Sequence, residues 1–251
     1  MSGLRESTIS PEIVTRLRQA KRIAVLTGAG ISAESGIPTF RDALSGLWAR
    51  FRPEDLATPE AFRRNPELVW AWYRSRRERL REIQPNPGHQ ALAELARRVP
   101  DFTLITQNVD GLHGRAGSRD VIELHGSLSR VKCFDGGHPA TDFEEGDGVP
   151  RCAQCGSMLR PDVVWFGELL PAEPLRRAQA AARSCELFFS VGTSNQVEPA
   201  ASLPWLAAAA GAEVIVLNPS SEGQRAGKGI HHLSGPAGVV LPALLQEAWP
   251  E

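Results

Sequence analysis

Five short apolar segments recur along this chain, separated by stretches with helical periodicity. They are residues 23–26, 102–106, 121–124, 186–191 and 214–217. Strands that alternate with helices predict a parallel sheet, because parallel neighbours need a crossover connection and a helix usually supplies it. We therefore expect an α/β fold in which helices cover both faces of a parallel sheet. A chain of 251 residues is long enough to bury one substantial core of this kind.

Glycines and polar residues directly follow these segments. They include Gly28 after the first, Asn108 after the second, His125 after the third, Gly192 after the fourth and Asn218 after the fifth. In open parallel sheets, ligands bind beyond the carboxyl ends of the strands, at a switch in strand order. These residues are therefore predicted to meet at one edge of the sheet and form a single composite site.

The glycine-rich turn after the first segment departs from that of a dehydrogenase. Gly28, Gly30 and Ala33 have the spacing that lets a backbone approach a pyrophosphate. A Rossmann dehydrogenase would continue into a long helix and place an acid about 20 residues later. Here Pro38 ends such a helix early, and no acid follows at that distance before Glu54. We predict a short helix and then an ordered loop that brings the residues TFRD to the ligand.

Two regions interrupt the alternation and are interpreted as insertions. Residues 48–84 are arginine-rich and helical in pattern, and residues 132–159 contain three of the four cysteines. We therefore expect a Rossmann-like sheet domain made of residues 1–47, 85–131 and 160–251. Residues 48–84 and 132–159 would form a smaller inserted domain.

The composition argues against some classes of partner. A formal net charge of −1 gives no electrostatic basis for binding nucleic acid or an anionic membrane. The longest apolar runs are far shorter than the roughly 20 residues that span a bilayer, and the first residues, MSGLREST, lack an apolar signal region. We expect a cytoplasmic protein that binds neither nucleic acid nor membrane. The sequence does not predict an oligomeric state.

Residues 28–42, GAGISAESGIPTFRD, resemble the signature of the sirtuins, the NAD-dependent protein lysine deacylases. Further matches follow in order, namely QNVDGLH from Gln107, ELHGS from Glu123, RPDVVWFGE from Arg160, GTS from Gly192, NPS from Asn218 and GPAG from Gly235. The resemblance covers about residues 23–245. It implies a Rossmann-like sheet domain with a small inserted domain of zinc-ribbon-like and helical type, and NAD as co-substrate.

The resemblance implies that His125 and Asn108 are the catalytic residues. His125 would be the general base that takes a proton from the nicotinamide ribose, once the acyl oxygen of the substrate has attacked the anomeric carbon. An imidazole with a pKa near 6.5 suits this task at neutral pH. Asn108 and Asp110 would position the ribose and the nicotinamide amide, with Gln107 against the ribose. Asn, Asp and Gly are also ordinary turn formers, which is the alternative explanation for this segment.

The resemblance also implies a set of cofactor-binding residues. Arg41 would neutralise a phosphate or hold the cofactor loop, Phe40 would shield the anomeric centre from water, and Ser194, Asn218 and Ala237 would line the adenosine half. The full set is Gly28, Ala29, Gly30, Ser32, Phe40, Arg41, Trp48, Gln107, Asn108, Asp110, Gly192, Thr193, Ser194, Asn218, Pro219, Ser220 and Ala237.

Tyr73 and Arg76 bear on the substrate class. They lie three residues apart on a predicted helix and therefore share one face. A guanidinium can bind a carboxylate through two charge-assisted hydrogen bonds, and a phenol can add a third. The pair resembles the acyl pocket of class III sirtuins, which prefer succinyl, malonyl or glutaryl lysine over acetyl lysine. The alternative is a solvated basic helix, since several arginines surround the pair.

The segment VVWFGE, residues 163–168, would contact the substrate peptide. In sirtuins, residues here pair with the extended peptide through backbone hydrogen bonds, as in strand addition. The resemblance assigns this role to Val164, Phe166, Gly167 and Glu168. An ordinary buried strand would explain the same apolar residues.

The cysteines depart from the family pattern. Cys152 and Cys155 form a C-x-x-C half-site for zinc, but the earlier half-site begins at Cys133 and has glycine at its second position. Three thiolates do not complete a tetrahedral structural site, so His138 or Asp135 would have to supply the fourth ligand. The alternative is a metal-free module held by packing. Any zinc here would be structural, because it belongs to the insertion.

The sequence therefore predicts an NAD-dependent deacylase that removes succinyl, malonyl and also acetyl groups from protein lysines. Its products would be nicotinamide and an O-acyl-ADP-ribose. Two alternatives stay open at this point. One is mono-ADP-ribosyl transfer, in which a different nucleophile intercepts the same ribose. The other is a non-catalytic sensor of NAD or ADP-ribose.

Overall fold

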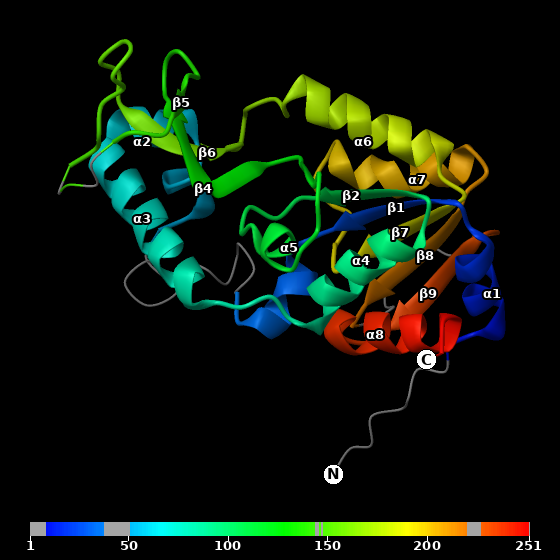
Figure 1. The fold of residues 1–251 in the computed structure, drawn as a ribbon. Coiled ribbons are helices and arrows are strands. Elements are labelled where there is room, and N and C mark those ends of the chain that lie inside the picture. The colour runs from blue at the N-terminus through cyan, green and yellow to red at the C-terminus, as the bar shows by residue number, and fades with distance from the viewer. Residues whose placement is uncertain (1–8, 38–50, 144–145, 147, 220–226, 251) are drawn as a thin grey trace.

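The computed structural model describes residues 9–37, 51–143, 146, 148–219 and 227–250. Its main feature is a six-stranded sheet with the order β3-β2-β1-β7-β8-β9, in which every pairing is parallel (Figure 1). The strands are β1 (Arg22–Thr27), β2 (Asp101–Thr106), β3 (Ile122–Glu123), β7 (Leu187–Val191), β8 (Glu213–Asn218) and β9 (Ile230–Ser234). The predicted parallel sheet is confirmed, and each of the five predicted segments overlaps one of its strands.

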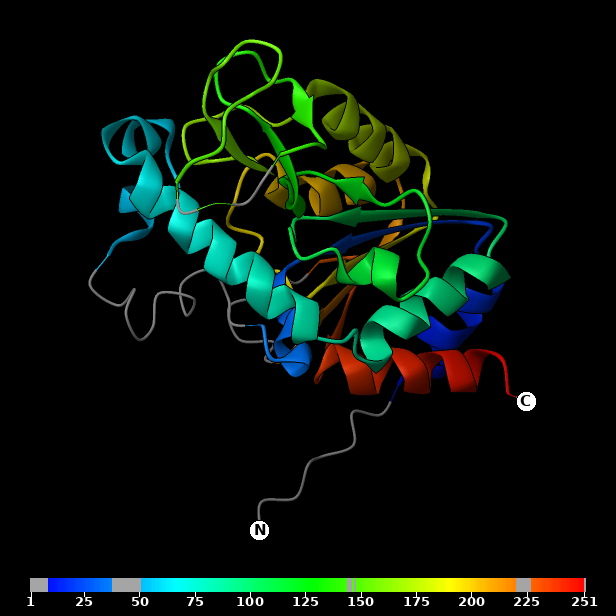
Figure 2. The same cartoon turned by 60° about the vertical axis from the view of Figure 1, so that its left-hand side comes forward.

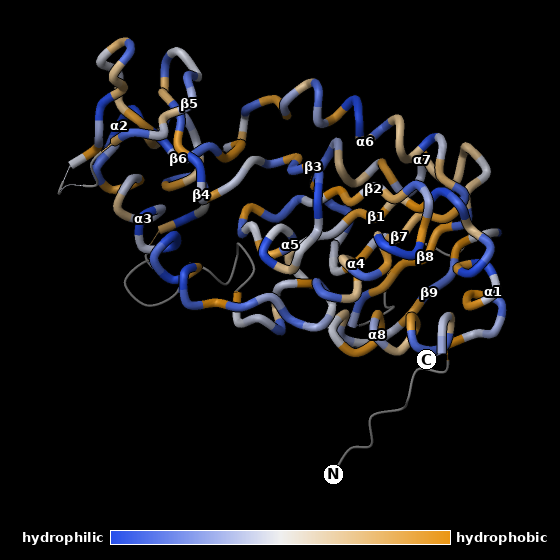
Figure 3. The backbone as a smooth tube through the Cα atoms, in the orientation of Figure 1, coloured by the Kyte–Doolittle hydropathy of each residue, from blue (hydrophilic) through white to orange (hydrophobic). Residues whose placement is uncertain are grey.

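Helices cover both faces of this sheet (Figures 1 and 2). Leu17 and Leu92 share one core with Ile23 and Val25 of β1, whereas Ala178 and other small residues pack on the opposite face. The first layer contains α1 (Pro11–Gln19), α4 (Pro87–Arg98) and α8 (Ala237–Ala248), and the second contains α6 (Ala172–Ser184) and α7 (Leu203–Ala209). Because both faces are covered, the central strands β1 and β7 are buried over almost their whole length and are mostly apolar, as the central band of Figure 3 shows.

Local sequence sets the start of the first four α-helices. Each begins with a proline, preceded by Ser10, Thr58, Asn65 or Asn86, whose side chain accepts a backbone N–H of the first turn. Proline suits this position because its fixed φ is helical and its missing N–H would have had no partner there. Within the region that was predicted to be helical, these caps set the starts of α2 (Pro59–Arg64) and α3 (Pro66–Glu82). Both helices follow the short η3 (Pro53–Asp55).

A second, antiparallel sheet packs with α2 and α3 beside the main sheet (Figure 1). Its order is β5-β4-β6, with β4 at Gly126–Cys133, β5 at Pro139–Ala140 and β6 at Leu159–Val163. We call α2, α3 and this sheet the small module. Its two cores contain Trp72, Tyr73 and Trp165 in one, and Trp70 with Cys133 in the other. This sheet extends beyond the predicted insertion of residues 132–159, since β4 begins at Gly126 and β6 continues to Val163.

Short helical elements follow β1 and β2 and precede α7. As predicted, the turn after β1 leads into a short helix, the 3-10 helix η1 (Ala29–Ser35), which Gly36 ends in the left-handed conformation with a φ of 82°. The short α5 (Leu112–Arg115) follows β2, and η4 (Ala200–Ser202) precedes α7. No described helix is both long and apolar enough to cross a membrane.

Candidate active site

A cavity of about 810 Å³ brings together residues from both parts of the molecule. The sheet side contributes η1, residues 107–110 after β2 and His125, and the small module contributes α3 and the segment after β6. Of the predicted site residues, the cavity is lined by Ala29, Ser32, Tyr73, Arg76, Gln107, Asn108, Asp110, His125, Val164, Phe166, Gly167 and Glu168. The predicted base, acyl pair and peptide segment therefore face one space.

His125 lies just after β3, and its ring is held by one backbone contact. Its Nδ1 is 2.9 Å from the carbonyl oxygen of Gln107. A carbonyl can only accept, so Nδ1 carries the proton and Nε2 keeps a free lone pair. Burial lowers the pKa of His125 below its usual value, although the bond to Gln107 opposes this shift. The ring is therefore a neutral base at pH 7.

Asn108 is fixed by the glycine turn and η1. Its Nδ2 donates to the carbonyl of Gly28 at 3.0 Å and to Ser32 Oγ at 3.2 Å. Ser32 in turn donates to Asp110 Oδ2 at 2.8 Å. Both amide hydrogens of Asn108 thus have protein partners, so its Oδ1 is the atom of this side chain left for a ligand donor.

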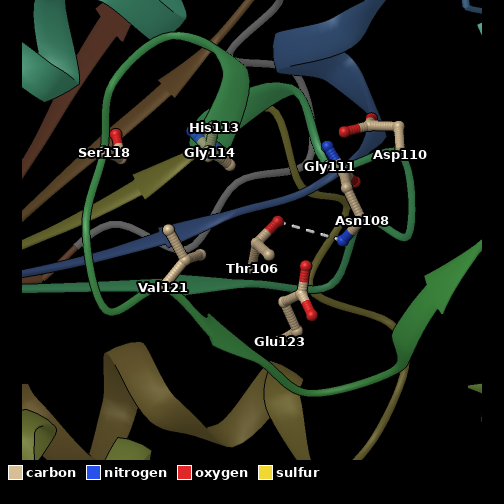
Figure 4. Close-up of a pocket in the computed structure, with 9 residues that line it drawn as sticks. All are labelled: Thr106, Asn108, Asp110, Gly111, His113, Gly114, Ser118, Val121 and Glu123. Atoms are coloured by element: carbon tan, nitrogen blue, oxygen red, sulfur yellow. Dashed lines mark hydrogen bonds between the residues drawn. The ribbon is translucent and has the colours of Figure 1, made fainter. Parts of the chain in front are cut away.

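A smaller cavity of about 270 Å³ lies beside α5 and shares Asn108 and Asp110 with the larger one (Figure 4). His113 lines it and has the opposite tautomer to His125. Thr27 Oγ1 donates to Thr106, so it accepts from His113 Nε2, and His113 Nδ1 is left as an acceptor with no protein partner in the described parts of the chain. Burial lowers the pKa of His113 to about 3, which keeps this ring neutral.

Only glycine fits at two positions of the turn after β1, because this turn lies very close to the turn after β7. Gly30 donates to the carbonyl of Gly192 at 2.8 Å. A Cβ on Gly28 would lie 2.7 Å from Thr193 Cβ, and one on Gly30 would lie 2.7 Å from Gly192 Cα. A side chain at either position would therefore force apart the loops that follow β1 and β7.

The other predicted cofactor residues that the structure describes lie at the same edge of the sheet but do not line the larger cavity. Gln107 Nε2 donates to Thr193 Oγ1 at 2.9 Å, and Asn218 Nδ2 donates to the carbonyl of Thr193 at 3.1 Å. Ser194 and Pro219 are exposed, and Ala237 is buried at the start of α8. Phe40, Arg41, Trp48 and Ser220 lie outside the described residues.

The predicted acyl pair lies on α3, one turn apart, facing the cavity. The Tyr73 side chain is buried, whereas Arg76 is half-buried with its guanidinium carbon 4.9 Å from the centre of the Trp72 ring. Burial raises the pKa of Tyr73 to about 12. Burial also lowers the pKa of Arg76, but the negative charge of Asp110 opposes this shift. The pocket thus offers a neutral phenol and a guanidinium to whatever enters it.

The predicted peptide segment begins at Val163, the last residue of β6, and continues from Val164 to Glu168 as irregular chain with a turn. The N–H of Val164 already donates to the carbonyl of His125, and the N–H of Phe166 donates to that of Ala57, both at 2.9 Å. The Glu168 carboxylate binds Arg160 at 2.5 and 2.9 Å. A peptide bound here would have to pair with other backbone groups of the segment. Phe166 is half exposed beside the cavity.

A cysteine and histidine cluster lies in the small module, formed by Cys133, His138, Cys152 and Cys155. Their ligand atoms all lie within 4.8 Å of one another. Cys133 Sγ is 3.4 Å from Cys155 Sγ, and Cys152 Sγ is 3.8 Å from His138 Nδ1. Ligand atoms of a tetrahedral zinc site are about 3.5–3.8 Å apart, from Zn–S near 2.3 Å and Zn–N near 2.0 Å. The donor set and its spacing therefore fit zinc.

The geometry decides between the two fourth ligands that the sequence left open. Asp135 accepts a hydrogen bond from Ser157 at 2.6 Å and is not in the cluster, whereas His138 is. A Cβ added to Gly136 would lie 2.5 Å from the His138 ring. The imidazole therefore fills the space that the side chain of a cysteine at position 136 would need. Contact with His138 lowers the pKa of the Cys152 thiol to about 6.

Comparison with known proteins identifies the family of this chain. Residues 28–199 match the model described as the Sir2 family. The chain belongs to the Sir2 family. Its relatives include NAD-dependent protein deacylase 1 of Pseudomonas aeruginosa, 52% identical with 95% of this chain and 98% of the relative covered. An NAD-dependent protein deacylase of Ralstonia nicotianae is 56% identical, with 91% and 93% covered.

Solved Sir2 structures have the same fold. A crystal structure of a Sir2 homologue with NAD has a TM-score of 0.87 and 43% identity, covering 98% of this chain and 96% of that one. A Sir2 complex with a p53 peptide and NAD+ has a TM-score of 0.78 and 31% identity, covering 94% and 97%. Both complexes share their family with this chain.

Sequence reasoning assigned no role to several residues that shape the site. Trp165 and Arg160 lie within the quoted motif RPDVVWFGE, and His113 within QNVDGLH, but no spacing rule indicates what they contact. His89 is buried on α4 and bonds to Ser32 at 3.3 Å. Its only sequence signal is its position three residues after Asn86, the residue that caps α4.

Proposed function

We propose that this protein is an NAD-dependent protein lysine deacylase that prefers short acyl groups ending in a carboxylate, with acetyl lysine as a second substrate. The main support is the shared cavity, in which a neutral His125 faces the same space as Tyr73 and Arg76. The relatives named as NAD-dependent protein deacylases support the reaction. The p53 peptide complex of a Sir2 neighbour supports a protein substrate.

His125 acts as the general base. NAD, when bound, supplies a ribose carbon that accepts the acyl oxygen as nicotinamide leaves, so that the acyl group ends on ADP-ribose. The free Nε2 of His125 takes the proton of the ribose hydroxyl, while Gln107 holds the ring through Nδ1. Asn108 Oδ1 is an acceptor beside the same space, oriented by its bonds to Gly28 and Ser32.

Tyr73 and Arg76 select the acyl group. A carboxylate only accepts hydrogen bonds, and both groups are donors. The guanidinium binds it with charge-assisted bonds, which contribute about 1.5–3 kcal/mol relative to an acyl chain that lacks the charge. A structural zinc held by Cys133, His138, Cys152 and Cys155 would stabilise the module that supplies this pair.

The test compares succinyl-lysine and acetyl-lysine versions of one peptide, with mass spectrometry of both products. Arg76→Met should lower kcat/KM for the succinyl peptide relative to the acetyl peptide by roughly 10- to 100-fold, the effect of losing a charged hydrogen-bond donor. Arg81→Met is the matched control, because Arg81 lies on the same helix, is exposed and does not line the cavity. It should leave the ratio unchanged.

Other outcomes would count against the proposal at different levels. Equal losses of kcat/KM on both peptides would mean that Tyr73 and Arg76 have a general structural role and do not select the acyl group. Transfer of ADP-ribose to the peptide, without O-acyl-ADP-ribose, would favour mono-ADP-ribosyl transfer. Binding of NAD without turnover of either peptide would favour a sensor.

A further inference from the structure

Trp165 is directly bonded to the acyl pair. Its indole Nε1 lies 2.9 Å from the Tyr73 hydroxyl oxygen, and both side chains are buried. An indole N–H can donate but cannot accept, so the Tyr73 oxygen is the acceptor in this bond. The single proton of the phenol must therefore point in another direction.

No second partner of the hydroxyl takes this proton among the described residues. Trp165 is the one hydrogen-bond partner of the Tyr73 hydroxyl in the part of the chain that the structure describes. Tyr73 lines the 810 Å³ cavity together with Arg76 and His125. Because burial raises the pKa of Tyr73 to about 12, the hydroxyl keeps its proton across the working pH range.

Trp165 itself is held on several sides. Its backbone N–H donates to Glu168 Oε2 at 2.8 Å. The Arg160 guanidinium lies over the indole, 3.4 Å from the ring centre, and is fixed by both Glu168 oxygens and by the carbonyl of Val163 at 2.8 Å. Arg160 is 3% exposed, so this ion pair is shielded from solvent on the arginine side. The indole N–H thus has little freedom to turn away from Tyr73.

We infer that Trp165 is a positioning residue for acyl selection: its indole N–H orients the Tyr73 hydroxyl so that the phenol donates its proton to a carboxylate at the end of the acyl chain. The inference rests on the proposed function and assigns a selectivity role to a residue that need not touch the acyl group. An acetyl group ends in a methyl and offers no acceptor at this place. The orientation of the Tyr73 proton therefore matters only for acyl groups with a terminal acceptor.

The test is a double-mutant cycle read as the ratio of kcat/KM for succinyl and acetyl peptides. Trp165→Phe removes the indole N–H and keeps an aromatic ring, and should lower the succinyl-to-acetyl ratio by roughly 3- to 10-fold, the effect of one neutral hydrogen bond. Tyr73→Phe should lower the ratio as well. In the Tyr73→Phe background, Trp165→Phe should not lower it further, because the hydroxyl through which Trp165 acts is gone.

A merely structural role would give a different pattern. If Trp165 only packs the pocket, its substitution lowers the ratio equally in both backgrounds, or leaves it unchanged, and either result overturns the inference. Should Trp165→Phe not fold, Trp165 can be replaced by β-(3-benzothienyl)alanine, in which sulfur takes the place of the N–H at nearly the same volume. That variant should show the same loss of ratio. Absent succinyl turnover by the wild-type protein would instead refute the proposed function.

Discussion

Among single residues, the tautomer and the pKa of His125 are set by one carbonyl and by burial. The Gln107 carbonyl fixes the proton on Nδ1, and burial lowers the pKa of the ring. The base is the deprotonated form, so lowering its pKa extends activity to more acidic pH. We predict that kcat/KM for deacylation falls on the acid side with a midpoint below the 6.5 or so of an ordinary histidine.

A pH profile of kcat/KM on one acylated peptide measures this midpoint. His125→Ala should abolish turnover while NAD still binds. His231→Gln is a suitable control, because His231 pairs with Glu213 at 2.6 Å and does not line the cavity. The His231→Gln variant should show the same fall in kcat/KM at acidic pH as the wild-type protein. A midpoint at or above 6.5, or an unchanged profile in His125→Ala, would argue against His125 as the base.

Among the elements, the loop between β4 and β5 contributes His138 to the cluster and has glycine at position 136. The His138 ring occupies the space beside Gly136 and supplies the fourth ligand atom of the cluster. We therefore predict one zinc per chain in protein purified without chelator. His138→Ala should weaken zinc affinity by more than the roughly 10- to 100-fold that loss of an outer-shell partner costs. Competition with a chromophoric chelator measures this affinity.

Asp135→Ala provides the matched control for this loop. Asp135 bonds to Ser157 outside the cluster, so its removal should leave zinc bound. Equal zinc loss in both variants would mean that the loop fold, and not the imidazole, determines binding. Folded protein without zinc would support the metal-free alternative.

The elements also show where sequence reasoning succeeds. Strands such as β1 and β7 are buried on both faces, so their apolar runs could be recognised directly. The edge strand β9 contains the half-buried sequence IHHLS, and β4 contains GSLSRVKC, and neither has a pattern that separates it from a loop.

For the site, motifs indicated His125, Asn108, Tyr73 and Arg76, and the structure shows that all four line one cavity. They could not assign Trp165, because its partner Tyr73 is 92 residues away in sequence and only the fold joins them. Choosing between His138 and Asp135 likewise required the course of the loop. Local patterns therefore predicted most of the main sheet and the candidate site residues, while long-range contacts determine how those side chains are oriented.

At the scale of the whole molecule, the active cavity lies between two bodies with separate cores. The main sheet packs its strands against two helical layers, and the small module has its own apolar clusters around Trp72, Trp165 and Trp70. Figures 1 and 2 show the module beside one end of the sheet. Since the module supplies α3 and the segment after β6, the proposed acyl pocket depends on its folding, whereas the main sheet has cores of its own.

This division predicts that removing zinc unfolds one part before the other. A structural zinc contributes folding free energy only to the elements that it links. After chelation, amide hydrogen exchange should accelerate in β4, β5 and β6, while β1, β7 and β8 keep their protection. Hydrogen-exchange mass spectrometry resolves these segments, and deacylation should fall in step with the module. Loss of protection in both sheets at the same chelator concentration would mean that the molecule unfolds as one cooperative unit.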